Sequence, residues 1–300
     1  MGSLKILVLG REGQAARSLA ERARHHEAFE VQFVGRPEFD LEDEGKVAQV
    51  VEAYGPDVIV NAAAYTAVDR AEAEVETAHR INAIGPALIA REAKRRGARL
   101  VHLSTDYVYD GQSPVPYAED AAVDPINVYG KTKLLGEEGV RAELPGEHII
   151  VRTSWVYSPF GNNFVKTMLN LAQTRDRVNV VSDQVGSPTS AFDLADGLLA
   201  AIGRWRIDPK QGLGETYHLA GAGQTSWAGL AERIMDVSRD CGGRSAGIVP
   251  ISTAEYPTAA ARPRFSILNS AKFRSTFDYA CEPWEVAIAK VVKRLARTAD

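Results

Sequence analysis

A tyrosine and a lysine four residues apart, Tyr129 and Lys133, have types and spacing that could do chemistry. On a helix, residues i and i+4 share one face, so the phenol and the ammonium would lie side by side. The positive charge favours the phenolate, and we expect it to lower the tyrosine pKa and ease proton transfer. A tyrosine packed beneath a solvated helix shows the same spacing. The interpretation therefore depends on finding a cofactor site and a further polar group.

A glycine turn near the N-terminus could supply the cofactor site. The apolar run Lys5–Gly10 predicts a buried parallel strand, and Ala15–Arg24 predicts a helix. Between them, the G-x-x-G pattern ending at Gly13 lets the backbone approach a pyrophosphate at the helix N-terminus. The third small position is Ala16 rather than glycine. Judged alone, a plain tight turn between strand and helix fits equally well.

The residues after the second predicted strand, Val31–Val34, bear on the choice of dinucleotide. In NAD-preferring enzymes an acid near this point holds the ribose hydroxyls. Here the strand runs into Gly35 and Arg36, and a guanidinium could receive a 2′-phosphate instead. We therefore expect NADPH, with NADH as the alternative; Arg36 could also be a solvated loop residue. Asp40 and Leu41 follow where an adenine needs a polar and an apolar neighbour.

Two further strands should deliver residues to the same edge of the sheet. The strand Asp57–Val60 runs into small residues, which allow a ligand to lie against the backbone. The strand Leu100–Leu103 is followed by Ser104 and Thr105, which add hydroxyl groups. Because parallel strands end at one edge, these segments and the glycine turn should meet there.

The regular alternation of strands and helices predicts an α/β fold with a doubly wound, Rossmann-like parallel sheet. The segment Asn127–Arg141 reads as the helix that carries the tyrosine and the lysine. The alternation fades after Arg152. We expect residues 1–152 to form the dinucleotide-binding domain, with returning elements near 178–203, and residues 153–300 to form mainly a smaller, interleaved α/β substrate lobe.

Composition bounds the class of protein. The chain of 300 residues is 45% hydrophobic and 25% charged, as in soluble globular proteins. Its net charge of −4 gives no long-range attraction to nucleic acid or to an anionic membrane. It has two cysteines and no apolar run long enough to span a bilayer. We therefore expect a cytoplasmic protein with no nucleic-acid or membrane partner.

Several longer motifs, in order along the chain, give a more specific indication. They are Asp57-Val58-Ile59-Val60-Asn61-Ala62-Ala63-Ala64-Tyr65, Ser104-Thr105-Asp106-Tyr107-Val108-Tyr109, Asn127-Val128-Tyr129-Gly130-Lys131-Thr132-Lys133, Arg152-Thr153-Ser154-Trp155-Val156-Tyr157, Gly161-Asn162-Asn163-Phe164, Asp183-Gln184-Val185-Gly186-Ser187-Pro188-Thr189 and Arg262-Pro263. With these motifs the chain resembles the dTDP-4-dehydrorhamnose reductases, a branch of the extended short-chain dehydrogenases. The resemblance runs from Gly10 to about Trp284.

The resemblance implies reduction of dTDP-4-dehydro-6-deoxy-L-mannose to dTDP-L-rhamnose by NAD(P)H, in the synthesis of a donor for cell-surface polysaccharide. In this interpretation Thr105, Tyr129 and Lys133 are catalytic, with Tyr129 as the proton donor. The expected cofactor-binding residues are Gly10, Gly13, Gln14, Ala15, Arg36, Asp40, Leu41, Ala62, Ala63, Ala64, Tyr65, Ser104, Tyr129 and Lys133. The expected substrate-binding residues are Thr105, Asp106, Trp155, Asn162, Asn163 and Arg262. Trp155 could instead be a core aromatic, and the two asparagines could cap a helix.

The resemblance also raises the question of a metal. Members of this family are described with Mg²⁺ bridged by glutamates near a dimer interface, and the corresponding positions here hold Ser18 and Phe192. Neither offers a carboxylate, which argues against Mg²⁺ and favours a monomer or a weak homodimer.

Two alternative functions stay open from the sequence. One is a sugar-nucleotide epimerase or dehydratase of the same fold. Dehydratases place an Asp-Glu pair after the threonine, whereas Tyr107 follows Asp106 here. The other is a non-catalytic regulatory subunit related to the family, against which the intact Thr105, Tyr129 and Lys133 argue.

Overall fold

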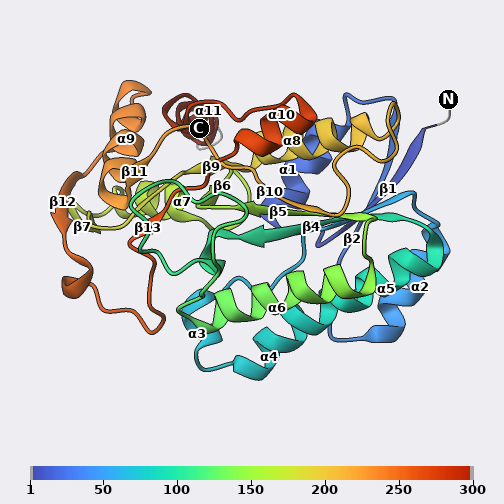
Figure 1. Ribbon diagram of the computed structural model, residues 1–300. Coiled ribbons are helices and arrows are strands. Elements are labelled where there is room, and N and C mark those ends of the chain that lie inside the picture. Colours follow the sequence, from blue (N-terminus) through green and yellow to red (C-terminus); the bar gives the residue numbers. More distant parts are fainter. Residues whose placement is uncertain (1–2, 298–300) are drawn as a thin grey trace.

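The computed structural model describes residues 3–297 and is built on a six-stranded sheet (Figure 1). The strands lie in the order β10-β5-β4-β3-β1-β2, and every neighbouring pair is parallel. Their bounds are β1 Leu4–Leu9, β2 Phe29–Val34, β3 Val58–Asn61, β4 Arg99–Thr105, β5 His148–Thr153 and β10 Glu215–His218. The order reverses between β1 and β3, and open α/β sheets bind ligands beyond the strand ends at such a switch point.

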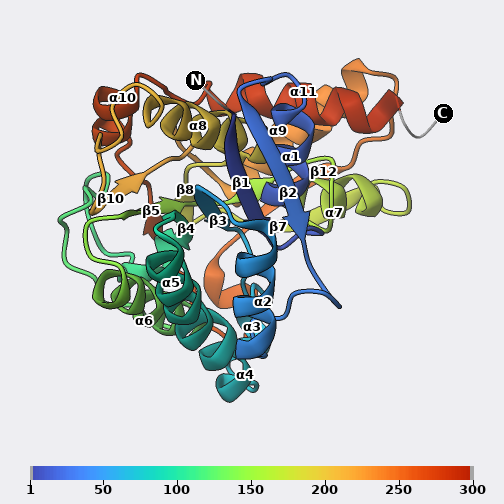
Figure 2. The same cartoon turned by 90° about the vertical axis from the view of Figure 1, so that its right-hand side faces the viewer.

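Helices cover both faces of this sheet (Figures 1 and 2). One layer contains α1 (Gln14–Ala23), α8 (Ala191–Arg204) and α10 (Ala271–Phe277), and the other contains α2 (Glu44–Tyr54), α5 (Gly85–Arg96) and α6 (Val128–Glu143). On α8, Leu194, Leu198 and Ile202 recur every four residues, so they lie along one stripe that is buried in the core with α1. The predicted α/β class with a doubly wound parallel sheet is confirmed.

An irregular turn precedes α5 on the second face. The short helices α3 (Val68–Ala71) and α4 (Val75–His79) lead into a π-helical segment, Arg80–Ile84. Buried Asn82 in that segment accepts a hydrogen bond from the Tyr65 backbone N–H at 2.8 Å and donates to the Tyr65 carbonyl at 3.0 Å. These two bonds fix the loop that follows β3, so the π-helical turn positions one wall of the strand-end region.

The smaller lobe, on the left in Figure 1, is built from short strands and three helices. The helices are α7 (Phe164–Leu171), α9 (Trp227–Asp240) and α11 (Trp284–Arg297), and their buried faces share one core cluster. The strands are β6 (Val156–Tyr157) with β9 (Thr189–Ser190), β7 (Arg177–Val181) with β12 (Gly247–Ile251), and β11 (Thr225–Ser226) with β8 (Val185–Gly186) and β13 (Phe265–Ser266). This lobe stands at the end of the sheet where the parallel strands finish.

The segments that return to the main sheet differ in part from those expected near 178–203. Helix α8 returns, but β7 pairs with β12 in the lobe, and the edge strand β10 comes from beyond that range. Short apolar runs read alike in the sequence, and only tertiary packing decides which sheet each one joins. Within residues 3–297, no helix is both long enough and apolar enough to cross a membrane.

Candidate active site

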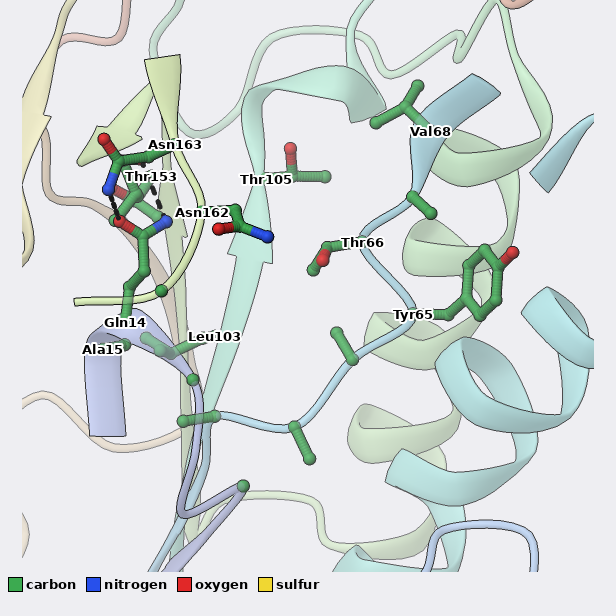
Figure 3. Close-up of a pocket in the computed structure, with 18 of the residues that line it drawn as sticks. Gln14, Ala15, Tyr65, Thr66, Val68, Leu103, Thr105, Thr153, Asn162 and Asn163 are labelled. Carbon is green, nitrogen blue, oxygen red and sulfur yellow. Dashed lines mark hydrogen bonds between the residues drawn. The ribbon is translucent and has the colours of Figure 1, made fainter. Parts of the chain in front are cut away.

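A cavity of about 990 Å³ lies beyond the C-terminal ends of β1, β3 and β4. The glycine turn, the loop after β3, the end of β4, helix α6 and the lobe all contribute to its wall, part of which is drawn in Figure 3. Of the predicted site residues, Arg262 is not among those that line it, and all the others are. The structure thus brings segments that are far apart in the sequence into one site.

The glycine turn is shaped by its neighbour across the sheet. Gly10 has φ 107°, and a Cβ there would lie 2.9 Å from the Ala63 backbone nitrogen. A side chain would therefore push β1 and β3 apart at their ends, which explains the glycine. Gly13 caps α1 without a side-chain bond, so the first N–H groups of the helix remain available to an anion.

Gln14 connects this turn to the lobe. Its side-chain oxygen accepts hydrogen bonds from Asn163 Nδ2 at 2.9 Å (Figure 3) and from Ser158 Oγ at 3.0 Å. Asn163 also caps α7, because its Oδ1 accepts from the Lys166 backbone N–H at 3.2 Å. The capping alternative therefore holds for Asn163. Asn162 caps no helix; it is exposed, and its amide extends toward the cavity in Figure 3.

Two arginines stand at the far end of the cavity, beyond the glycine turn. Arg36, 67% exposed, pairs with Asp40 at 2.9 Å and with Glu42 at 3.7 Å. Arg11, which the sequence interpretation missed, lines the same wall and donates to the Arg36 carbonyl at 3.1 Å. An incoming phosphate would compete with Asp40 for the Arg36 guanidinium.

Helix α6 presents Tyr129 and Lys133 because its N-terminus packs closely on the segment after β4. Asn127 caps the helix by accepting from the Gly130 N–H at 2.8 Å. A Cβ at Gly130 would overlap the Tyr107 carbonyl, so only glycine permits this approach. The approach brings the tyrosine hydroxyl to the side chain of Thr105, whose hydrogen bond lowers the Tyr129 pKa.

The expected lowering of the Tyr129 pKa by Lys133 is wrong for this structure. Burial raises the Tyr129 pKa to about 12; the Thr105 hydrogen bond opposes the rise and the Asp106 charge adds to it. Lys133 Nζ instead donates to the Leu103 carbonyl at 2.7 Å, and burial lowers the Lys133 pKa to about 8, against the opposite effect of Glu137. At neutral pH the tyrosine is thus a neutral acid and the lysine a cation.

A buried ion pair holds the end of β4 in place. Glu137, one helical turn after Lys133, accepts from Arg152 Nε at 2.8 Å and from Arg152 Nη2 at 2.6 Å. It also accepts from Ser104 Oγ at 2.6 Å. Ser104 lines the cavity, as expected of a cofactor-binding residue, but its hydroxyl hydrogen is already used by Glu137. The pair thereby fixes the residue that precedes Thr105.

Thr105 and Asp106 form a second polar group at the same strand end. Thr105 Oγ1 donates to Asp106 Oδ1 at 3.0 Å and accepts from the Tyr107 N–H at 3.2 Å. Asp106 is 2% exposed, and its Oδ2 is buried with no hydrogen-bond partner. Burial raises the Asp106 pKa to about 7, although the nearby hydroxyl groups of Ser266 and Thr105 lower it.

At the lobe end of the cavity, Trp155 stacks face to face on Trp227, with ring centroids 3.6 Å apart and an interplanar angle of 7°. Trp155 has a backbone φ of 47°, and a Cβ at Gly186 would overlap its indole. One face of the indole is therefore covered, and only its remaining surface is left for a sugar. No sequence pattern marked Trp227, because it reaches the site only through the packing of α9.

Arg262 is held away from the cavity wall. Its Nη2 donates to Asp69 Oδ2 at 2.7 Å, and its guanidinium lies over the Tyr107 ring, 6.0 Å from the centroid. Asp69 belongs to α3, so this contact joins the chain near residue 262 to the Rossmann side of the molecule. Arg262 thus lies behind the cavity-lining Tyr107 and is paired with an acid, and its contact with the substrate stays a prediction.

Comparison with known proteins shows which family the chain is similar to. The family model described as "RmlD substrate binding domain" matches residues 4–297. The dTDP-4-dehydrorhamnose reductase of Sinorhizobium fredii is 43% identical over 96% of this chain and 97% of its own. That of Salmonella typhimurium is 41% identical over 98% and 99% of the two chains.

The chain belongs to the dTDP-4-dehydrorhamnose reductase family. Among solved structures, the family member from Bacillus anthracis, in complex with NADP, superposes with a TM-score of 0.88 at 35% identity, covering 96% of this chain and 98% of the other. The member from Clostridium acetobutylicum gives a TM-score of 0.89 at 36% identity, covering 97% and 99%.

The positions that the resemblance associates with Mg²⁺ do not fit that ion. Ser18 is fully buried, and the Phe192 ring lies beneath two guanidinium groups, Arg22 at 4.7 Å and Arg294 at 5.4 Å from its centroid. Mg²⁺ takes hard oxygen ligands, which neither the phenylalanine ring nor the arginines supply, and the two guanidinium groups over the ring would repel it. In the part of the chain that the structure describes, no three His, Cys, Asp or Glu side chains form a group that could hold a metal ion.

Proposed function

We propose that this protein is an NAD(P)H-dependent dTDP-4-dehydrorhamnose reductase and that it converts dTDP-4-dehydro-6-deoxy-L-mannose to dTDP-L-rhamnose. The observation that carries the proposal is the placement of Tyr129, Lys133 and Thr105 around one cavity with the glycine turn. A single cavity then accommodates a dinucleotide at the strand ends and a sugar nucleotide toward the lobe. Identities of 41–43% over nearly the whole chain to dTDP-4-dehydrorhamnose reductases support the choice of reaction.

The residues divide the chemistry as follows. Bound NADPH supplies the hydride that attacks C4 of the keto sugar. Tyr129, which is neutral at physiological pH and whose pKa burial raises further to about 12, donates its proton to the oxygen that becomes the hydroxyl. The Thr105 hydrogen, which goes to Asp106 Oδ1 in this structure, would turn to the same oxygen, and Lys133 would provide a cation for the nicotinamide ribose. The small residues Ala62, Ala63 and Ala64 let the cofactor lie against the backbone.

Tyr129→Phe tests the assignment. Turnover should fall by about 10²–10⁴-fold with NADPH binding nearly unchanged, because the variant loses only the proton donor. Tyr54→Phe is the matched control, since the Tyr54 hydroxyl donates to the Glu30 carbonyl on α2's side of the sheet, away from the cavity. NADPH oxidation would be measured with enzymatically prepared dTDP-4-dehydro-6-deoxy-L-mannose. Full activity of Tyr129→Phe contradicts the role of the tyrosine.

For the cofactor we propose a preference for NADPH over NADH. Arg36 supports it, with Arg11 beside it on the same wall, and the relative from Bacillus anthracis was solved with NADP. Arg36→Ala should weaken binding of NADPH but leave that of NADH nearly unchanged, as measured by fluorescence titration. The exposed Arg95→Ala on α5 is the control. Tighter binding of NADH than of NADPH by the unaltered protein would overturn the preference.

The alternative functions are separated by simple observations. A UDP-glucose 4-epimerase at 17% identity and a dTDP-glucose 4,6-dehydratase at 19% share the fold, with TM-scores of 0.80. An epimerase should retain a tightly bound NAD through purification, whereas a reductase exchanges its cofactor at every turnover. A regulatory subunit would bind a partner protein without oxidising NADPH. A cytoplasmic location and a monomer or weak homodimer stay predictions, to be checked by fractionation and by mass measurement with and without a chelator.

A further inference from the structure

The hydroxyl of Thr105 links Tyr129 to Asp106. A threonine hydroxyl has one hydrogen and two lone pairs. Its hydrogen goes to Asp106 Oδ1 at 3.0 Å, and one lone pair receives the Tyr107 N–H at 3.2 Å. The Tyr129 hydroxyl also lies within hydrogen-bonding reach of Thr105, and the Thr105 hydrogen lowers the Tyr129 pKa when it turns from Asp106 toward the tyrosine oxygen. Tyr129, Thr105 and Asp106 therefore form a continuous chain of groups that can each give and accept a proton.

Asp106 has the surroundings of a group that stores a proton. It lines the cavity, it is 2% exposed, and its Oδ2 has no hydrogen-bond partner. The titratable groups that face it are Tyr107 on its own segment and Tyr129 on α6. Hydroxyl groups reach it from Thr105 on β4 and Ser266 on β13. Burial raises the Asp106 pKa to about 7, so both protonation states are accessible at neutral pH.

Each reduction takes one proton from Tyr129. The tyrosine is then a phenolate in a buried site. We propose that Asp106 returns this proton through the hydroxyl of Thr105. The Thr105 hydrogen moves to the phenolate oxygen as the Asp106 carboxyl hydrogen moves to Thr105 Oγ1. Tyr129 and Thr105 are then neutral again and Asp106 is a carboxylate, which takes a proton from water in the cavity after the product leaves. Asp106 thus acts on the reacting group through Thr105 and is a positioning and relay residue; the proposal rests on the proposed reductase function.

Asp106→Asn tests the relay, because asparagine keeps a hydrogen-bond acceptor for Thr105 but cannot carry the proton. The first turnover uses the proton already on Tyr129, so with saturating sugar nucleotide its rate should fall far less than the steady-state rate, even though Asp106 lines the cavity. Later turnovers wait for re-protonation, and the steady-state rate should fall by about 100-fold. Rapid mixing with saturating NADPH and the keto sugar nucleotide should therefore show a burst of one equivalent of NADPH oxidised per site, followed by a slow phase.

Two further variants sharpen this test. Asp120→Asn, an exposed carboxylate on the loop after Asp106, should show no burst. Thr105→Ser retains the hydroxyl and should keep the steady-state rate within about fivefold of wild type. If the first turnover and the steady state of Asp106→Asn fall together, Asp106 is merely structural and the proposal is overturned. Unchanged steady-state turnover in Asp106→Asn overturns it as well.

The wild-type protein gives a second test that does not depend on a variant folding. Above about pH 7 Asp106 loses its proton, so the steady-state rate should fall with rising pH while the first-turnover rate stays level. Lys133 also titrates near pH 8, but saturating NADPH compensates for its effect on cofactor binding. A parallel fall of both rates contradicts the relay. If wild type oxidises no NADPH with this sugar, the proposed function fails, which is a different result from the absence of a burst.

Discussion

The buried pair of Glu137 and Arg152 should be the most sensitive polar feature of this fold. Their side chains are 0% and 3% exposed and are joined by bonds of 2.8 and 2.6 Å. Arg152→Met removes the cation and leaves the Glu137 carboxylate buried, with Ser104 and the partly exposed Arg141 as remaining partners. Breaking a buried pair from one side costs about 3–5 kcal/mol.

That free energy converts to a measurable shift in Tm. An unfolding entropy of about 2.1 cal/mol/K per residue gives about 0.6 kcal/mol/K for 300 residues. Arg152→Met should therefore lower the Tm by about 5–8 °C in differential scanning calorimetry at neutral pH. An exposed pair gives the contrast: Arg95→Ala, which breaks the ion pair with Glu92, should cost less than about 1 kcal/mol.

A second substitution isolates the charge as the cause. Adding Glu137→Gln to Arg152→Met removes the uncompensated carboxylate and should recover most of the lost stability.

The effect of pH on the stability from this pair has a definite sign. Although burial opposes it, Arg152 holds the Glu137 pKa below its ordinary value, so the pair contributes stability above the unfolded-state pKa of 4.5 that is lost as the pH falls. In Arg152→Met the carboxyl can protonate, and the difference from wild type should shrink toward about pH 5. A double variant as unstable as the single one would refute this reasoning.

Three further outcomes follow from the site. Gly10→Ala should weaken NADPH binding in a fluorescence titration by at least tenfold, or about 1.4 kcal/mol, because its Cβ would lie 2.9 Å from the Ala63 nitrogen at a φ of 107°; unchanged affinity contradicts the close approach. Asp40→Asn should release Arg36 and raise the ratio of NADPH to NADH affinity, and a fall in this ratio would show that the acid does not compete with phosphate. Asp106→Asn should raise the Tm at about pH 8, since the folded-state pKa of about 7 exceeds the unfolded value of 3.8 and the stability from Asp106 is lost as the pH rises through 7; a gain confined to acidic pH would contradict it.

Local patterns in the sequence were enough to predict the Rossmann-like half of the fold. The strands β1, β3, β4 and β5 are mostly apolar over their central residues, whereas β2 alternates apolar and polar residues; each of the five ends at or next to a small or polar residue. Strands of this kind, separated by helices, are compatible with few arrangements other than a parallel sheet, and their carboxyl ends must then share an edge. The grouping of the glycine turn, the loop after β3 and the end of β4 followed directly from that rule.

The sheet membership of the later segments could not be predicted in the same way. The strands β7 and β10 are both short and mix polar with apolar residues, yet β7 joins the lobe and β10 the edge of the main sheet. Which strand pairs with which, over such distances in the chain, depends on how the rest of the chain packs. That information lies in three-dimensional packing rather than in local residue spacing.

At the site, the sequence by itself determined which groups are present, and the tertiary structure decided their protonation and orientation. The spacing of Tyr129 and Lys133 predicted that both lie on one face of a helix. In the folded chain, burial raises the Tyr129 pKa, and Lys133 donates its hydrogen bond to the Leu103 carbonyl. Arg262 pairs with Asp69 behind the cavity-lining Tyr107, a partner that the sequence did not indicate. The periodicity of a helix or strand determines on which face a side chain lies. Burial and ion pairing depend on residues from other parts of the chain, which become neighbours only when the chain folds.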